Sequence, residues 1–171
     1  MQSDDPVRSM AAVLEPAQLR ILEAVAERIF PATDTPGATA IGAVEYIVRA
    51  LAGDYPEEIP IYERGLGEID RHALKRFGKN FTELEESHRD AVLSDFEHGR
   101  VDFEGAADFF ETVRCHVLEG VFGEPEYGGN RDLAGWRIVD FPGQQYGYPD
   151  AYINRRVDLP PVAADPKKED K

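Results

Sequence analysis

The chain is 171 residues long, with 42% hydrophobic and 30% charged residues, a balance typical of one soluble globular domain with a single core. Its 33 acidic residues outnumber its 19 basic residues and give a formal net charge of −14. Such a field repels phosphate backbones and anionic lipids, which makes nucleic acids and membrane surfaces poor candidates for direct partners.

The first third of the sequence predicts a flexible lead and two helices. Residues 1–15 form the lead, and Pro16 suits the first turn of a helix, where its missing N–H costs nothing. Apolar residues recur at helical spacing up to Pro31, which ends this helix. A turn at Pro36-Gly37 precedes a second helix that ends at Gly53, with an apolar stripe formed by Ile41, Val44, Ile47, Val48 and Leu51.

The middle of the sequence predicts a loop over residues 54–60 and three more helices. The third helix ends at Gly78, which fits a C-terminal cap, and the fourth begins with a capping box at Ser87. The fifth extends from about Gly105 to Phe122. No stretch alternates apolar and polar residues with β-branched enrichment. We therefore expect an all-α fold, a compact bundle of about five helices.

A long irregular segment from Gly123 to Tyr152 follows the helices and completes a single domain over residues 16–152. It is rich in glycine and proline, and aromatic residues occur throughout it: Tyr127, Trp136, Phe141, Tyr146, Tyr148 and Tyr152. A segment so broken and so aromatic either packs over its own bundle or contacts a partner. Residues 153–171 are predicted to form a solvated tail.

The sequence contains few features of a nucleophilic catalytic site or of a metal site. No serine stands in a G-x-S-x-G motif, and Cys115 and His116, as neighbours on a helix, point roughly 100° apart and cannot form a dyad. Neither H-E-x-x-H nor C-x-x-C is present. We therefore expect no catalytic residue and no metal ligand on this chain. A small enzyme that uses carboxylates or His116 in a pocket between helices stays open as the alternative.

Nucleotide binding is not predicted either. The sequence contains neither G-x-G-x-x-G nor a P-loop. Gly128-Gly129 follows no predicted strand and is not accompanied by a lysine where a phosphate would need one. We therefore expect no flavin or nicotinamide cofactor on this chain.

One long run of residues carries a family resemblance. The run L-E-G-V-F-G-E-P-E-Y-G-G-N-R-D from Leu118 to Asp132, followed by Gly135-Trp136 and Phe141-Pro-Gly143, resembles the signature of the gluconate 2-dehydrogenase subunit 3 family. Earlier pieces fit the same family: A-E-R-I-F-P at residues 26–31, D-T-P-G at residues 34–37 and V-E-Y-I at residues 44–47. The likeness covers roughly residues 18–146.

The resemblance implies a non-catalytic small subunit of a membrane-associated dehydrogenase that oxidises gluconate, glucose, fructose or glycosides. The large subunit of such a complex is an FAD protein of the glucose–methanol–choline type, which performs the hydride chemistry. A multihaem cytochrome c subunit often takes the electrons onward. The small subunit is thought to help the large subunit fold, mature and leave the cell, frequently by carrying a twin-arginine signal for both.

The location of the chain is an expectation from the same resemblance. The N-terminus of the sequence, M-Q-S-D-D-P, is acidic and shows no twin-arginine pair, no basic region and no apolar region of a signal peptide. We expect the periplasm by resemblance, with the cytoplasm and a transient assembly chaperone as the alternatives. No apolar run approaches the roughly 20 residues of a membrane span, so direct membrane insertion is not expected.

The irregular segment supplies the predicted partner-interface residues, which are Phe122, Tyr127, Gly128, Gly129, Asn130, Arg131, Trp136 and Phe141. Aromatic rings provide rigid anchors at interfaces, and Arg131 or Arg137 offers bidentate pairing with carboxylates. The glycine pair permits positive φ and close backbone approach. The alternative is that the segment only packs on its own bundle, with Trp136 buried in the core.

Overall fold

The fold is built from helices. The computed structural model describes residues 13–143 and 159–164, and these ranges contain seven α-helices, four short 3-10 helices and no β-strand. An isolated parallel bridge joins Gly143 to Val162. The predicted all-α fold is therefore confirmed.

Five long helices form the bundle, as the apolar stripes predict. They are α2 (Pro16–Ile29), α4 (Ala43–Gly53), α5 (Ile59–Phe77), α6 (Glu86–Glu97) and α7 (Ala106–Phe122). The connections contain two short α-helices, α3 (Ala38–Ile41) and α8 (Ala134–Ile138), and the 3-10 helices η1 (Pro56–Glu58), η2 (Phe81–Glu83), η3 (Pro125–Tyr127) and η4 (Arg131–Leu133). No helix in the described ranges is both long enough and apolar enough to cross a membrane.

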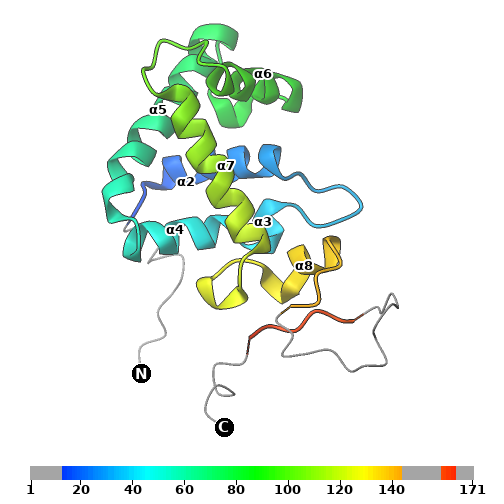
Figure 1. Ribbon diagram of the computed structural model, residues 1–171. Coiled ribbons are helices and arrows are strands. Elements are labelled where there is room, and N and C mark those ends of the chain that lie inside the picture. Colours follow the sequence, from blue (N-terminus) through cyan, green and yellow to red (C-terminus); the bar gives the residue numbers. More distant parts are fainter. Residues whose placement is uncertain (1–12, 144–158, 165–171) are drawn as a thin grey trace.

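Helix α7 lies at the centre of the bundle. It runs diagonally across the molecule, from the end formed by α5 and α6 to the end formed by α3 and α8, and packs against α2, α4, α5 and α6 (Figure 1). Each large apolar side chain removed from water contributes about 1.5–3 kcal/mol to folding. The core side chains include Leu22, Ile47, Leu51, Leu66, Phe96, Phe109, Val113, Val117 and Val121.

Two helix boundaries differ from the sequence predictions because of single residues with special backbone properties. The one helix expected between Gly37 and Gly53 is divided at Gly42, whose φ of 93° lies in the left-handed region and interrupts the helix. Helix α5 begins at Ile59, inside the predicted loop, because Pro60 lies in its first turn, where a missing N–H is harmless.

The start of α6 also differs from the prediction at Ser87. The helix begins at Glu86 with Glu85 as its N-cap residue, and the Ser87 hydroxyl donates to Glu85 Oε1 at 3.1 Å instead of capping the helix. Leu84 is 4% exposed and belongs to the core. Burial of Leu84 fixes where the chain enters the helix, so Ser87 already lies inside it.

Candidate functional site

After α7 the chain turns back beneath the end of that helix. Within residues 123–143 it forms η3, η4 and α8, and α8 packs against α7 at the end of the molecule opposite α6 (Figure 1). All residues of the predicted interface set lie in this segment or, for Phe122, directly before it. The structure places them in two environments, one internal and one exposed.

Asn130 is the internal anchor of this segment. Its side chain is fully buried; Nδ2 donates to the Gly123 carbonyl at 2.9 Å, and Oδ1 accepts from the Gly135 N–H at 2.9 Å. Its backbone N–H donates to the Gly120 carbonyl at 2.7 Å, which supplies a partner to a carbonyl at the end of α7. Asn130 therefore ties the end of α7 to the start of α8.

Gly128 and Gly129 let the chain reach that position. Gly128 has a φ of 103°, and a Cβ on Gly129 would lie 2.1 Å from the Gly120 carbonyl oxygen. The prediction that this pair supplies positive φ and close backbone approach is confirmed. The backbone that Gly129 approaches is the chain's own helix α7.

Trp136 is an internal residue of α8. Its side chain is 3% exposed, its indole N–H donates to the Phe122 carbonyl at 2.6 Å, and its ring meets that of Phe141 edge to face with centroids 5.0 Å apart. The alternative in which Trp136 packs into its own chain therefore holds for this side chain. Trp136 thus ties α8 to the end of α7 and supports the Phe141 ring.

Two arginines fasten the segment to neighbouring helices. Arg131 Nη1 donates to the Ala40 carbonyl at 3.2 Å, and Nη2 donates to Glu45 Oε1 at 3.1 Å. Arg49 on α4 donates to the Glu126 carbonyl at 2.8 Å. Arg131 thus pairs with a carboxylate of its own chain. Together the two arginines attach the segment to α3 and α4.

The exposed part of the predicted set consists of Arg131 and two aromatic rings. Tyr127 is 55% exposed on η3, and Phe141 is 45% exposed after α8. Neither ring is covered by the helices that bury Trp136. The remaining predicted aromatic residues, Tyr146, Tyr148 and Tyr152, lie outside the described residues.

An open groove lies between the end of α7 and the turn after α8, and we call it the α7–α8 groove. Its volume is about 350 Å³, and the residues that line it are Phe122, Trp136, Val139, Asp140 and Phe141. Three of them belong to the predicted interface set. The sequence reasoning missed Val139 and Asp140, although the V-D-F-P sequence places an acid between two apolar residues just before a proline.

The backbone around the groove holds unusual conformations. The non-glycine residues with positive φ in the described ranges are Asn130, Asp132, Leu133 and Asp140. Asparagine and aspartate tolerate this region better than other residues, but a leucine at φ 58° is costly. Such conformations persist only where surrounding contacts enforce them, so the shape of this end is imposed by Asn130, Trp136 and the arginines.

The histidine considered for catalysis, His116, is enclosed by its own chain. It is 8% exposed; Nδ1 forms a hydrogen bond of 2.8 Å with the Tyr62 hydroxyl, and Nε2 lies 3.8 Å from Glu58 Oε2. The Tyr55 ring stacks on it at 5.4 Å. Burial raises the pKa of Tyr62, and the nearby Glu58 raises it further. His116 thus joins η1, α5 and α7 within the bundle.

Cys115, next to His116, points to solvent instead. Its thiol lies 3.4 Å from Glu111 Oε1. That hydrogen bond, more than burial, raises the pKa of Cys115 and disfavours the reactive thiolate. Within the described part of the chain, no group of three or more His, Cys, Asp or Glu side chains could hold a metal ion.

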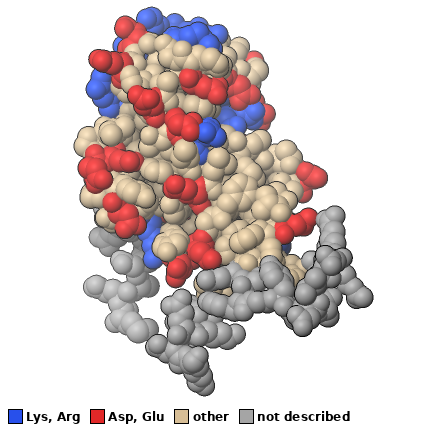
Figure 2. Space-filling model, viewed as in Figure 1, with Lys and Arg blue, Asp and Glu red and all other residues tan. Residues whose placement is uncertain are grey.

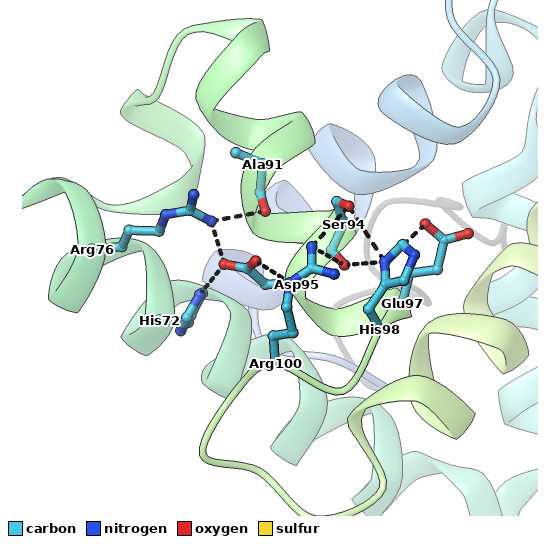
Figure 3. Close-up of polar contacts among 8 residues, drawn as sticks. All are labelled: His72, Arg76, Ala91, Ser94, Asp95, Glu97, His98 and Arg100. Atoms are coloured by element: carbon cyan, nitrogen blue, oxygen red, sulfur yellow. Dashed lines mark hydrogen bonds and ion pairs between the residues drawn. The ribbon is translucent and has the colours of Figure 1, made fainter.

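The opposite end of the molecule is closed by a network that we call the Asp95 cluster: Asp95, His72, Arg76 and Arg100 (Figure 3). His72 Nε2 donates to Asp95 at 2.9 Å, Arg100 Nε donates at 3.1 Å, and Arg76 forms a short contact with the same carboxylate. Burial alone would raise the pKa of Asp95, but the hydrogen bonds from His72 and Arg100 and the charge of Arg76 lower it. All four side chains form their ion pairs within the chain.

Comparison with known proteins adds one match. Residues 16–143 match the family model described as gluconate 2-dehydrogenase subunit 3. The matched range contains all five long helices, the α7–α8 groove and the Asp95 cluster. No curated protein and no solved structure matches the chain.

Proposed function

The chain belongs to the gluconate 2-dehydrogenase subunit 3 family, and on that premise we propose that it is a non-catalytic small subunit that stabilises an FAD-dependent dehydrogenase large subunit. That large subunit is of the glucose–methanol–choline type and oxidises a sugar, a glycoside or a sugar acid. It holds the FAD and performs the hydride transfer, and a cytochrome c subunit accepts the electrons. The assembled complex works in the periplasm.

The observation that carries this proposal is the state of residues 122–143. This segment is anchored to α7 by Asn130 and Trp136, yet it leaves Tyr127, Val139 and Phe141 about half exposed. Rigid aromatic side chains on a preformed surface are typical of protein interfaces, because little conformational freedom is lost on binding. The segment therefore fits an assembly role.

The chemistry of the described residues supports the non-catalytic part of the proposal. His116 is enclosed by Tyr55, Tyr62 and Glu58, and the Cys115 thiol bonds to Glu111. The bond to Glu111 raises the pKa of the Cys115 thiol and His116 is bonded to Tyr62, so neither side chain is arranged as an activated nucleophile. We therefore assign the oxidation chemistry to the partner subunit.

The test is recovery of the affinity-tagged full chain from its native host, followed by mass spectrometry, a visible absorption spectrum and a sugar-oxidation assay of the eluate. We expect a larger protein in fixed ratio to the chain, flavin absorption bands, release of FAD on denaturation, and turnover that needs the larger protein. A colourless chain without a partner, or turnover by the isolated chain, would overturn the proposal.

A further inference from the structure

We propose that the α7–α8 groove receives an apolar side chain of the large subunit, carried on a segment that also contains arginine or lysine. This inference rests on the proposed function, because it takes the flavin-bearing subunit as the occupant. It goes further by naming the surface that docks and the chemistry of the segment that fits it.

The groove is apolar and leaves its rim exposed. Val139 is 54% exposed and Phe141 is 45% exposed, whereas Trp136 beneath them is buried. Large exposed apolar side chains in the described ranges concentrate at this end: Tyr127, Val139, Phe141 and Val162 lie here, against Tyr55, Ile61 and Leu74 on the rest of the surface. A grouped apolar surface marks an interaction site more strongly than single exposed residues do.

The groove is also formed before any partner arrives. The ring of Phe122 meets Phe30 edge to face at 5.7 Å, and its carbonyl oxygen accepts the indole N–H of Trp136. Trp136 in turn supports Phe141. Because these contacts hold Phe122, Trp136 and Phe141 in place, an apolar side chain can enter between them without reordering the three rings, which lowers the cost of binding.

The charges around the groove select a basic partner segment. Residues 122–143 contain four acids, Glu124, Glu126, Asp132 and Asp140, against two arginines, of which Arg131 is paired with Glu45 and Arg137 is exposed on α8. The Asp140 carboxylate lines the groove and has no ion pair within the described part of the chain. Apolar contact fills the groove, and a cation beside it neutralises Asp140.

The distribution of charge over the molecule points the same way. Figure 2 shows most of the visible lysine and arginine side chains at the end formed by α5 and α6. The surface over α8 shows mainly uncharged side chains with acidic ones at its margins (Figure 2). The acidic side chains at the margins of this uncharged surface attract a basic segment.

The experiment measures the affinity of full-length variants for the flavin-bearing subunit that co-purifies with the wild-type chain. Phe141→Ala should weaken binding about tenfold or more, as expected for an aromatic anchor. Val139→Thr preserves side-chain shape and should weaken binding by a smaller factor. Asp140→Asn tolerates the positive φ at this position, and should weaken binding about two- to fivefold at low salt while reducing its salt dependence.

The matched control is Leu74→Ala. Leu74 is 47% exposed on α5, close to the value for Phe141, but it lies far along the chain from the groove. Its truncation should leave the affinity unchanged within about twofold. Circular dichroism and thermal unfolding of each variant verify the fold, and Val139→Thr decides the question if Phe141→Ala does not fold.

The outcomes separate this inference from the proposed function. If folded Phe141→Ala and Val139→Thr bind the flavin-bearing subunit as tightly as wild type, the groove is not the docking surface, although the subunit role stands. If the wild-type chain recovers no flavoprotein, both ideas fall. If sedimentation shows a dimer of the chain that Phe141→Ala converts to a monomer, a second copy of the chain occupies the groove. The proposal that the large subunit occupies it is then wrong.

Discussion

The two ends of this helical molecule use their side chains in opposite ways. In the Asp95 cluster, one buried carboxylate is shared by His72, Arg76 and Arg100 of the same chain. At the α7–α8 groove, Trp136 is equally fixed, but Val139 and Phe141 above it stay exposed. Both ends are anchored by contacts within the chain. They differ in the surface that they expose to water, which carries ion-paired side chains at the Asp95 cluster and apolar side chains at the α7–α8 groove.

This comparison indicates which end serves another protein. A carboxylate already surrounded by cations gains little from a further charge and loses its partners if the network opens. An exposed apolar surface, in contrast, gains roughly 25 cal/mol for each Å² that a partner covers. Anchoring alone therefore does not favour a docking surface, whereas anchoring combined with exposed apolar side chains supports the docking surface that we propose.

Replacing Trp136 by alanine should have the largest effect, because this residue supports the whole groove end. It removes a buried ring and the hydrogen bond to the Phe122 carbonyl. We expect the free energy of unfolding to fall by about 3–5 kcal/mol, measured by urea denaturation. Trp136→Phe, which keeps an apolar ring, should lose clearly less. Equal stability of Trp136→Ala and wild type would show that the groove is not anchored as described.

Gly129→Ala tests whether the chain's approach to α7 is obligatory. The added Cβ would meet the Gly120 carbonyl oxygen at 2.1 Å, and we expect a loss of about 1–3 kcal/mol from overpacking. The control is Gly67→Ala on α5, where a Cβ meets nothing within 4 Å; it should stabilise the helix by about 0.5–1 kcal/mol. Thermal unfolding midpoints that move in the same direction for both variants would contradict this contrast.

Asp95→Asn tests the closed end through its pH dependence. The pKa of Asp95 is lowered in the folded chain, so its contribution to stability is present above the unfolded pKa of about 4 and is lost as the pH falls through the folded value. We expect the variant to be about 1–2 kcal/mol less stable at pH 7. This difference should shrink on acidification below pH 4. Chemical denaturation at several pH values measures it, and a constant difference would refute the assignment.

Tyr62→Phe, between the two ends, should have the smallest effect. It removes the hydroxyl that bonds to His116 Nδ1 at 2.8 Å and leaves a buried nitrogen without that partner. We expect a loss of about 1 kcal/mol in the free energy of unfolding and no change in affinity for the large subunit. Thermal denaturation and the binding assay measure the two quantities, and a large loss of affinity would place α5 in the interface.

The long helices could be predicted because their apolar residues recur at a regular period. Phe109, Val113 and Val117 identify one face of α7 without any tertiary information. The interruption at Gly42 could not be predicted, since it depends on the positive φ of one residue. The start of α6 could not be predicted from Ser87, since burial of Leu84 decides it.

The composition of residues 122–143 indicated a segment that packs on its own bundle or contacts a partner, but not which side chains turn inward. Asn130 is buried because the end of α7 presents the Gly120 and Gly123 carbonyls to it. Val139 and Asp140 line the groove because the chain turns at φ 53° after α8. Whether a side chain here points inward or outward depends on contacts between distant parts of the chain. The spacing of apolar residues in the sequence carries no information about such contacts.

Hydrogen–deuterium exchange of the chain, free and bound to the flavin-bearing subunit, tests the central claim most directly. Peptides that cover residues 122–143 should exchange more slowly in the complex, while peptides that cover the Asp95 cluster, residues 70–100, should exchange at the same rate in both states. Protection confined to residues 70–100, with residues 122–143 unchanged, would contradict the assignment of the α7–α8 groove as the docking surface.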